Sequence, residues 1–156
     1  MGPEEEGKVE AGPGPRPKTC SYEKTDGDRC HKPSIEGSAE GLCLFHEPVG
    51  GKDDDACTRA FLKAVDGGEH DFEGYQLADA DLSGKVFHSD MIFRRAAFTG
   101  RTSFREANFT EYAFFQDATF KGGLDMGSVR FSNDVSFEGA TLRGDAIFEG
   151  DHFDKS

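Results

Sequence analysis

The sequence FRRAAFTGRTSFREANFTEYAFFQDATF, residues 93–120, returns to Phe at intervals that alternate between five and six residues. The spacing continues in both directions, at Phe87, Phe93, Phe98, Phe104, Phe109, Phe115, Phe120, Met126, Phe131, Phe137, Leu142, Phe148 and Phe153. Neither the helical period of about 3.6 residues nor the strand period of 2 fits it. A fixed longer repeat instead indicates a solenoid, in which each short unit buries its apolar side chain only when its neighbours stack on it.

The repeat begins before this ladder, with five-residue steps from Phe72 through Leu77 and Leu82 to Phe87. Two residues before most ladder positions stands a second small or aliphatic residue: Ala80, Met91, Ala96, Thr102, Ala107, Ala113, Ala118, Leu124, Val129, Val135, Ala140 and Ala146. Each unit therefore specifies two inward-facing positions. The predicted core is narrow and consists mainly of stacked Phe.

The unit ADLSG at residues 80–84 and the segment SFEGATLRGDAIFEG at residues 136–150 resemble the pentapeptide-repeat family. The resemblance covers about half of the chain. It implies an all-β fold, a right-handed quadrilateral β-helix over residues 70–154, in which the central residue and the one two positions before it point inward. The extra residue in every second unit gives 22 residues per coil and about four coils. The sequence leaves open whether that residue forms a bulge or a wider corner.

A cysteine-rich segment over residues 19–48 precedes the repeats. Cys20, Cys30, Cys43 and His46 have the spacing C-x9-C-x12-C-x2-H, and the closing Cys-x2-His pair places two ligands on one turn, as tetrahedral zinc requires. Four ligands leave no open position for water, so the spacing predicts one structural zinc ion and no catalysis at the metal. A zinc segment of this kind also resembles the N-terminal part of some microbial pentapeptide-repeat proteins.

Two alternatives to this ligand set remain open. His31 follows Cys30 directly and could compete with His46, but neighbouring residues rarely both point at one metal, so we favour His46. The cysteines could also be free thiols without a metal. Metal binding would supply folding free energy, on the order of 10 kcal/mol, to a segment with too little apolar surface to fold alone.

Residues 52–67 are predicted to form a short helix between the zinc segment and the repeats. Asp53 and its two following Asp residues suit a helix start, and Gly67 suits its end. Cys57 and Phe61 lie on one apolar stripe of this helix. Because a terminal coil needs a cap, we expect the stripe to cover the first coil.

Composition restricts the function classes. The formal net charge is -12, which disfavours non-specific binding to nucleic acid and to anionic membranes. No run of about 18 apolar residues is present, and acidic residues stand where a secretory signal would be basic, so we expect a cytoplasmic protein with reduced thiols. Residues 1–18, rich in Pro, Gly and Glu, are predicted to be a disordered tail.

The sequence indicates a non-enzymatic protein-interaction or scaffold protein with an unidentified protein partner. One alternative is implied by the family resemblance, since some acidic pentapeptide-repeat proteins mimic DNA and bind type II topoisomerases. Residues 72–153 hold 13 acidic and 8 basic residues, an excess too small to favour it strongly. A second alternative is a nucleic-acid-associated regulator acting through the zinc segment. No helix or polar cap follows Phe153, so either the chain is a fragment or its last coil is an interface, for which a homodimer is one hypothesis.

Overall fold

The computed structural model describes residues 18–154. The predicted disordered tail, apart from Lys18, lies outside the described residues. By its internal contacts the chain divides into two compact units, Met1–Cys43 and Leu44–Ser156. We describe each unit by itself.

The first unit holds no long strand or helix over residues 18–43. Three isolated antiparallel bridges join Thr19 to Pro33, Glu23 to Arg29 and Ser34 to Cys43. Between the first two cysteines the chain turns at Gly27, which has φ 89° and donates its N–H to the Lys24 carbonyl at 3.0 Å. A glycine suits this turn because it adopts positive φ without steric cost.

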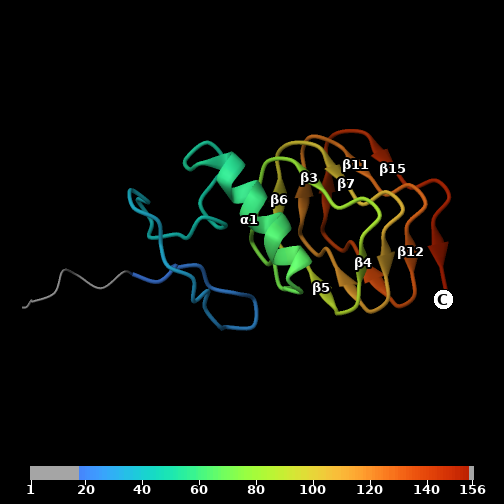
Figure 1. Ribbon diagram of the computed structural model, residues 1–156, viewed down its shortest axis with the longest axis horizontal. Coiled ribbons are helices and arrows are strands. Elements are labelled where there is room, and N and C mark those ends of the chain that lie inside the picture. Colours follow the sequence, from blue (N-terminus) through green and yellow to red (C-terminus); the bar gives the residue numbers. More distant parts are fainter. Residues whose placement is uncertain (1–17, 155–156) are drawn as a thin grey trace, which may run out of the picture. The chain divides into compact units, whose positions relative to one another are not determined.

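The second unit is a β-solenoid with one short helix, α1 (Asp54–Asp66), ahead of it (Figure 1). Its strands form four parallel sheets. One contains β2 (Gln76–Leu77), β6 (Ala97–Phe98), β10 (Thr119–Phe120) and β14 (Thr141–Leu142). The next contains β3 (Ala80–Asp81), β7 (Thr102–Ser103), β11 (Leu124–Asp125) and β15 (Ala146–Ile147). The others contain β4 (Val86–Phe87), β8 (Asn108–Phe109), β12 (Arg130–Phe131) and β16 (His152–Phe153), and β5 (Met91–Ile92), β9 (Ala113–Phe114) and β13 (Val135–Ser136).

The strand register confirms the predicted four-sided β-solenoid. Phe98 pairs with Phe120, and Phe120 pairs with Leu142, so one coil takes 22 residues. Ladder residues of successive coils stack on one another. The rings of Phe93 and Phe115 lie 5.1 Å apart at an interplanar angle of 4°, which gives the core its offset aromatic stacks.

The corners show where the extra residue of every second unit lies. At the tight corners two residues separate the inward positions, and the turn is closed by a backbone bond such as Ala107 N to Phe104 O at 2.9 Å. The third residue of these turns has positive φ, as at Glu106 (62°). At the wide corners three residues, such as 99–101, separate Phe98 from the next inward residue, Thr102. The extra residue therefore widens the corner and leaves the strand pairing unbroken.

Helix α1 covers the first coil. The Asp53 carboxylate accepts the Ala56 N–H at 2.9 Å, as an N-cap does, and the helix ends at Gly67. Cys57 and Phe61 are buried, and the Phe61 ring meets the Phe72 ring edge-on at 5.1 Å. The apolar stripe of the helix thus packs on the first ladder residue.

Candidate metal centre

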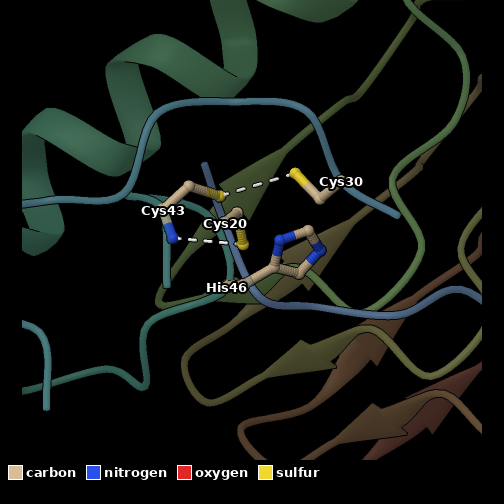
Figure 2. Close-up of side chains that lie close together, drawn as sticks. All are labelled: Cys20, Cys30, Cys43 and His46. Atoms are coloured by element: carbon tan, nitrogen blue, oxygen red, sulfur yellow. Dashed lines mark hydrogen bonds between the residues drawn. The ribbon is translucent and has the colours of Figure 1, made fainter. Parts of the chain in front are cut away.

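The four predicted ligands lie together. Cys20, Cys30, Cys43 and His46 are all buried, and their ligand atoms lie within 4.8 Å of one another (Figure 2). His31 is outside this group, and its Nε2 lies 3.4 Å from Asp28 Oδ1 with the side chain 79% exposed. The geometry therefore favours His46 over His31 as the fourth ligand.

The sulfur atoms fit a metal ion better than a disulfide. Cys30 Sγ and Cys43 Sγ are 3.9 Å apart, whereas a disulfide requires about 2.05 Å. The Cys43 N–H donates to Cys20 Sγ at 3.3 Å, an arrangement that stabilises negative charge on sulfur. Burial raises the pKa of the Cys30 thiol, and the nearby Cys20 adds to the increase. A bound cation would offset that cost, so this buried Cys3His group could hold a metal ion.

Two further residues, Glu73 and Lys52, hold the turn that carries His46 (residues 44–46, the ligand turn) in place, and sequence reasoning missed both. His46 Nε2 lies 2.8 Å from the Glu73 carbonyl oxygen. Lys52 Nζ donates to the Leu44 carbonyl at 2.7 Å and to the Gln76 carbonyl at 2.6 Å. No sequence signal could have identified them, because the acceptors are backbone carbonyls brought close only by folding.

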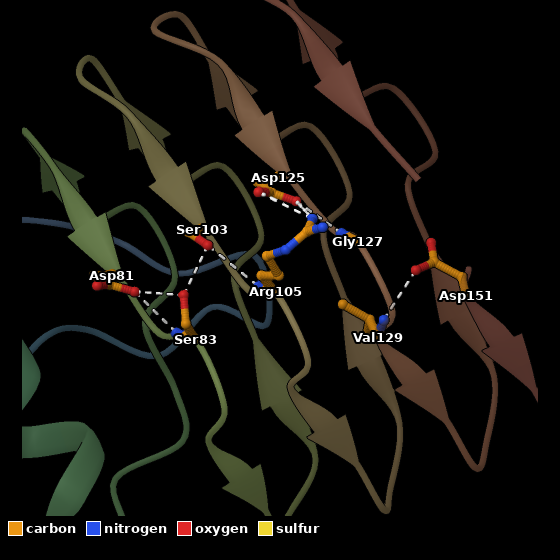
Figure 3. A network of polar contacts seen from close by, with 8 residues as sticks. All are labelled: Asp81, Ser83, Ser103, Arg105, Asp125, Gly127, Val129 and Asp151. Atoms are coloured by element: carbon orange, nitrogen blue, oxygen red, sulfur yellow. Dashed lines mark hydrogen bonds and ion pairs between the residues drawn. The ribbon is translucent and has the colours of Figure 1, made fainter. Parts of the chain in front are cut away.

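One outer face of the solenoid carries polar contacts within and between coils (Figure 3). Asp81 Oδ1 accepts the Ser83 hydroxyl at 2.6 Å and the Ser83 N–H at 3.1 Å. Ser83 Oγ lies 2.8 Å from Ser103 Oγ, and Arg105 donates to Asp125 Oδ1 at 3.0 Å. These side chains occupy equivalent positions in successive coils, so the face is a periodic polar surface fixed by its own hydrogen bonds.

Residues 83–130 match a family model described as pentapeptide repeats (9 copies). The match lies on the coils described above. This stretch, 48 of the chain's 156 residues, is similar to the pentapeptide-repeat family. Comparison with curated proteins and with solved structures found no match.

The pentapeptide-repeat solenoid is commonly a protein-interaction module and is generally not an enzyme. No helix within residues 18–154 combines the length and the apolar character that a membrane span requires. The predicted resemblance is confirmed, and the match runs from Ser83 to Arg130.

The last coil of the pentapeptide-repeat solenoid is open. Leu142 and Phe148 are each 41% exposed and Phe153 is 59% exposed, although the equivalent Phe120, Met126 and Phe131 are buried. Strands β14, β15 and β16 are each the outermost strand of their sheet. This end therefore presents apolar side chains beside unpaired strand edges.

Proposed function

We propose that this chain is a non-enzymatic protein-interaction and scaffold module, in which one structural zinc ion stabilises the N-terminal segment and the pentapeptide-repeat solenoid binds protein partners. The observation that carries the proposal is the open last coil. Its side chains at Leu142, Phe148 and Phe153 are 41%, 41% and 59% exposed. Exposed contiguous apolar groups beside a free sheet edge are typical of an association surface.

A second copy of the chain is the partner that this end fits. Strand edges need a partner with unpaired backbone groups in the same geometry, which an identical end supplies. The first coil is covered by α1, with Phe61 against Phe72, so head-to-tail stacking is disfavoured. Association through one end only closes into a two-fold dimer and does not continue into a fibre.

Sedimentation velocity over a range of protein concentrations tests the dimer. We expect a concentration-dependent monomer–dimer equilibrium that Phe153→Asp abolishes. The matched control is His152→Asp, because His152 is the outward residue of the same strand β16 and is exposed. A monomer at every concentration, or equal loss in both variants, would contradict the proposal.

The outer faces are the second element of the proposal. Arg95, Arg105 and Arg130 pair with Glu73, Asp125 and Asp154 at 2.6, 3.0 and 2.8 Å, so cations alternate with carboxylates along the repeats. This alternation supports a protein partner over DNA mimicry, which needs a continuous negative stripe.

Two outcomes would favour the alternatives. Inhibition of the supercoiling activity of a purified type II topoisomerase would favour DNA mimicry. Binding lost on nuclease treatment would favour the nucleic-acid-associated alternative.

The zinc ion is assigned from the donor chemistry. Three sulfur atoms and one imidazole nitrogen, all buried, make the closed tetrahedral set that zinc occupies in structural sites.

Elemental analysis of protein purified without chelators should find about one zinc per chain. Cys43→Ser should lose the metal and keep the β-rich circular dichroism of the solenoid, whereas Cys57→Ser, at a buried cysteine outside the group, should keep both. Metal-free wild-type protein would overturn the assignment. Reduced thiols of this kind support a cytoplasmic location.

A further inference from the structure

The turn that carries His46 is bound to the first coil by its backbone. The Gln76 N–H donates to the Phe45 carbonyl at 2.7 Å. Lys52 Nζ bridges the Leu44 and Gln76 carbonyls at 2.7 and 2.6 Å. Both backbone polar groups of Gln76, at the start of β2, are therefore satisfied by residues that precede the repeats.

The Phe45 carbonyl occupies the place that a preceding coil would fill. Along the same sheet, the Ala97 N–H donates to the Tyr75 carbonyl at 2.8 Å, and the Thr119 N–H donates to the Ala96 carbonyl at 2.9 Å. Gln76 is the register partner of Ala97, so its N–H is the equivalent donor one coil earlier. The Phe45 ring also stacks on Tyr75, with centroids 4.5 Å apart. The ligand turn thus continues the sheet.

The first coil also determines which nitrogen of His46 is available. A carbonyl oxygen only accepts hydrogen bonds, so His46 Nε2, 2.8 Å from Glu73 O, carries the proton and donates it. Nδ1 is then the unprotonated nitrogen, which can bind a metal through its lone pair. Figure 2 shows one ring nitrogen turned toward the cysteine sulfur atoms and the other on the far side of the ring. Tyr75 meets this ring edge-on at 5.4 Å and limits its rotation.

We propose that the first coil is the outer shell of the metal centre. The Glu73 carbonyl holds His46 as the Nε2–H tautomer so that Nδ1 binds the metal, and Lys52 is a positioning residue that holds the ligand turn on β2. The inference rests on the metal centre proposed above. Outer-shell hydrogen bonds of this kind orient a ligand and raise its affinity for metal by about 10- to 100-fold.

The tautomer is tested directly by NMR of the wild-type chain loaded with 113Cd and labelled with 15N at histidine. We expect the cadmium coupling on Nδ1 of His46 and a slowly exchanging proton on Nε2. A coupling on Nε2 would overturn the inference while leaving the metal centre intact. Protein that binds no cadmium and no zinc would overturn the metal centre itself, and the inference with it.

Lys52→Met tests the positioning role, because it keeps the aliphatic stem and removes both bonds to carbonyl oxygens. Zinc affinity is measured by competition with a chromophoric chelator, and we expect it to fall about tenfold or more. Lys121→Met is the matched control, since Lys121 is exposed on the solenoid surface. The Co2+ absorption spectrum reports whether the ligand geometry changes. Equal zinc affinity of the two variants, with both retaining solenoid circular dichroism, would overturn the positioning role.

Discussion

At one end of the solenoid Phe72 is fully buried, and at the other Phe153 is 59% exposed. Both residues occupy a ladder position and both stack on the ladder residue of the adjacent coil, Phe72 on Phe93 at 5.4 Å and Phe153 on Phe131 at 5.2 Å. The difference is what lies on the outer side. Phe61 of α1 and Tyr75 pack against Phe72, whereas Phe153 belongs to the outermost strand of its sheet.

The two ends show that a ladder position is not enough to bury a side chain. Each inner Phe of the ladder is buried between two neighbours, one in each adjacent coil. A Phe in a terminal coil has only one such neighbour, so it is buried only if another element supplies the second. At the first coil the chain supplies α1 and the ligand turn. At the last coil, among the described residues, no element does so, which is why we assign that end to association.

The largest expected effect is at a coil between the two ends. Phe115 is fully buried and stacks on Phe93 and Phe137. Phe115→Asp would place an unpaired charge in this core, and we expect a loss of more than about 4 kcal/mol in the free energy of unfolding. Gln116→Asp adds the same charge at the next, partly exposed corner position and should cost about 1 kcal/mol or less. Urea denaturation followed by circular dichroism measures both, and equal effects would contradict the register.

The second prediction compares the ends directly. Phe72→Ala should lower the free energy of unfolding by about 3–5 kcal/mol, as expected for a Phe between packed neighbours. Phe153→Ala should lower it by about 1 kcal/mol or less, because most of that ring is already in water. Both are measured by urea denaturation at a concentration where the chain is monomeric. A large effect at Phe153 under those conditions would mean that its ring is covered in solution.

Periodicity was enough to predict a solenoid, and the resemblance to the pentapeptide-repeat family supplied its four-sided coil of 22 residues. The alternating spacing located the inward positions, because stacking of Phe on Phe repeats a single local requirement along the chain. The place of the extra residue could not be derived. It lies at wide corners such as residues 99–101, whereas the tight corners take positive φ at residues such as Arg95 and Asp117, whose side chains give no sign of it.

The grouping of Cys20, Cys30, Cys43 and His46 could also be predicted, because thiol and imidazole groups at a Cys-x2-His spacing have few other uses. What holds His46 in position could not. Glu73 acts through its backbone carbonyl, and Lys52 is a lysine among many charged residues of the chain. Contacts made by backbone atoms leave no residue-type signal, so they are visible only when the chain is folded.

The third prediction concerns a tight turn that recurs at the same corner of successive coils, from the first coil to the last. Gly84 and Gly150 occupy its positive-φ position in the first and last coils, and Glu106 occupies it between them with φ 62°. Glu106→Gly removes the steric cost of a side chain there and should raise the free energy of unfolding by about 0.5–1 kcal/mol. Glu138→Gly is the control, because Glu138 precedes the positive-φ residue of a turn of the same type and gains no such relief. A loss of stability in both variants would show that the strain is negligible.

The smallest expected effect is the opposite pH response of two aspartates, Asp81 in the first coil and Asp151 in the last. Hydrogen bonds from the Ser83 hydroxyl and N–H lower the pKa of Asp81. Burial raises the pKa of Asp151, which donors such as the Val129 N–H at 2.9 Å only partly offset. The ionised form is therefore favoured by folding at Asp81 and disfavoured at Asp151.

The stability that Asp81 contributes is complete above its unfolded pKa of about 3.9 and is lost as the pH falls through its lower folded pKa. The cost at Asp151 is complete above its raised folded pKa and disappears as the pH falls to the unfolded value. Titration of the carboxyl 13C shifts by NMR measures both pKa values in one sample. Ser83→Ala should raise the pKa of Asp81 toward its ordinary value and leave Asp151 unchanged, because Ser83 donates to the first and has no contact with the second. Shifts of the same sign in the wild-type chain would mean that the two ends do not differ in how they hold a carboxylate.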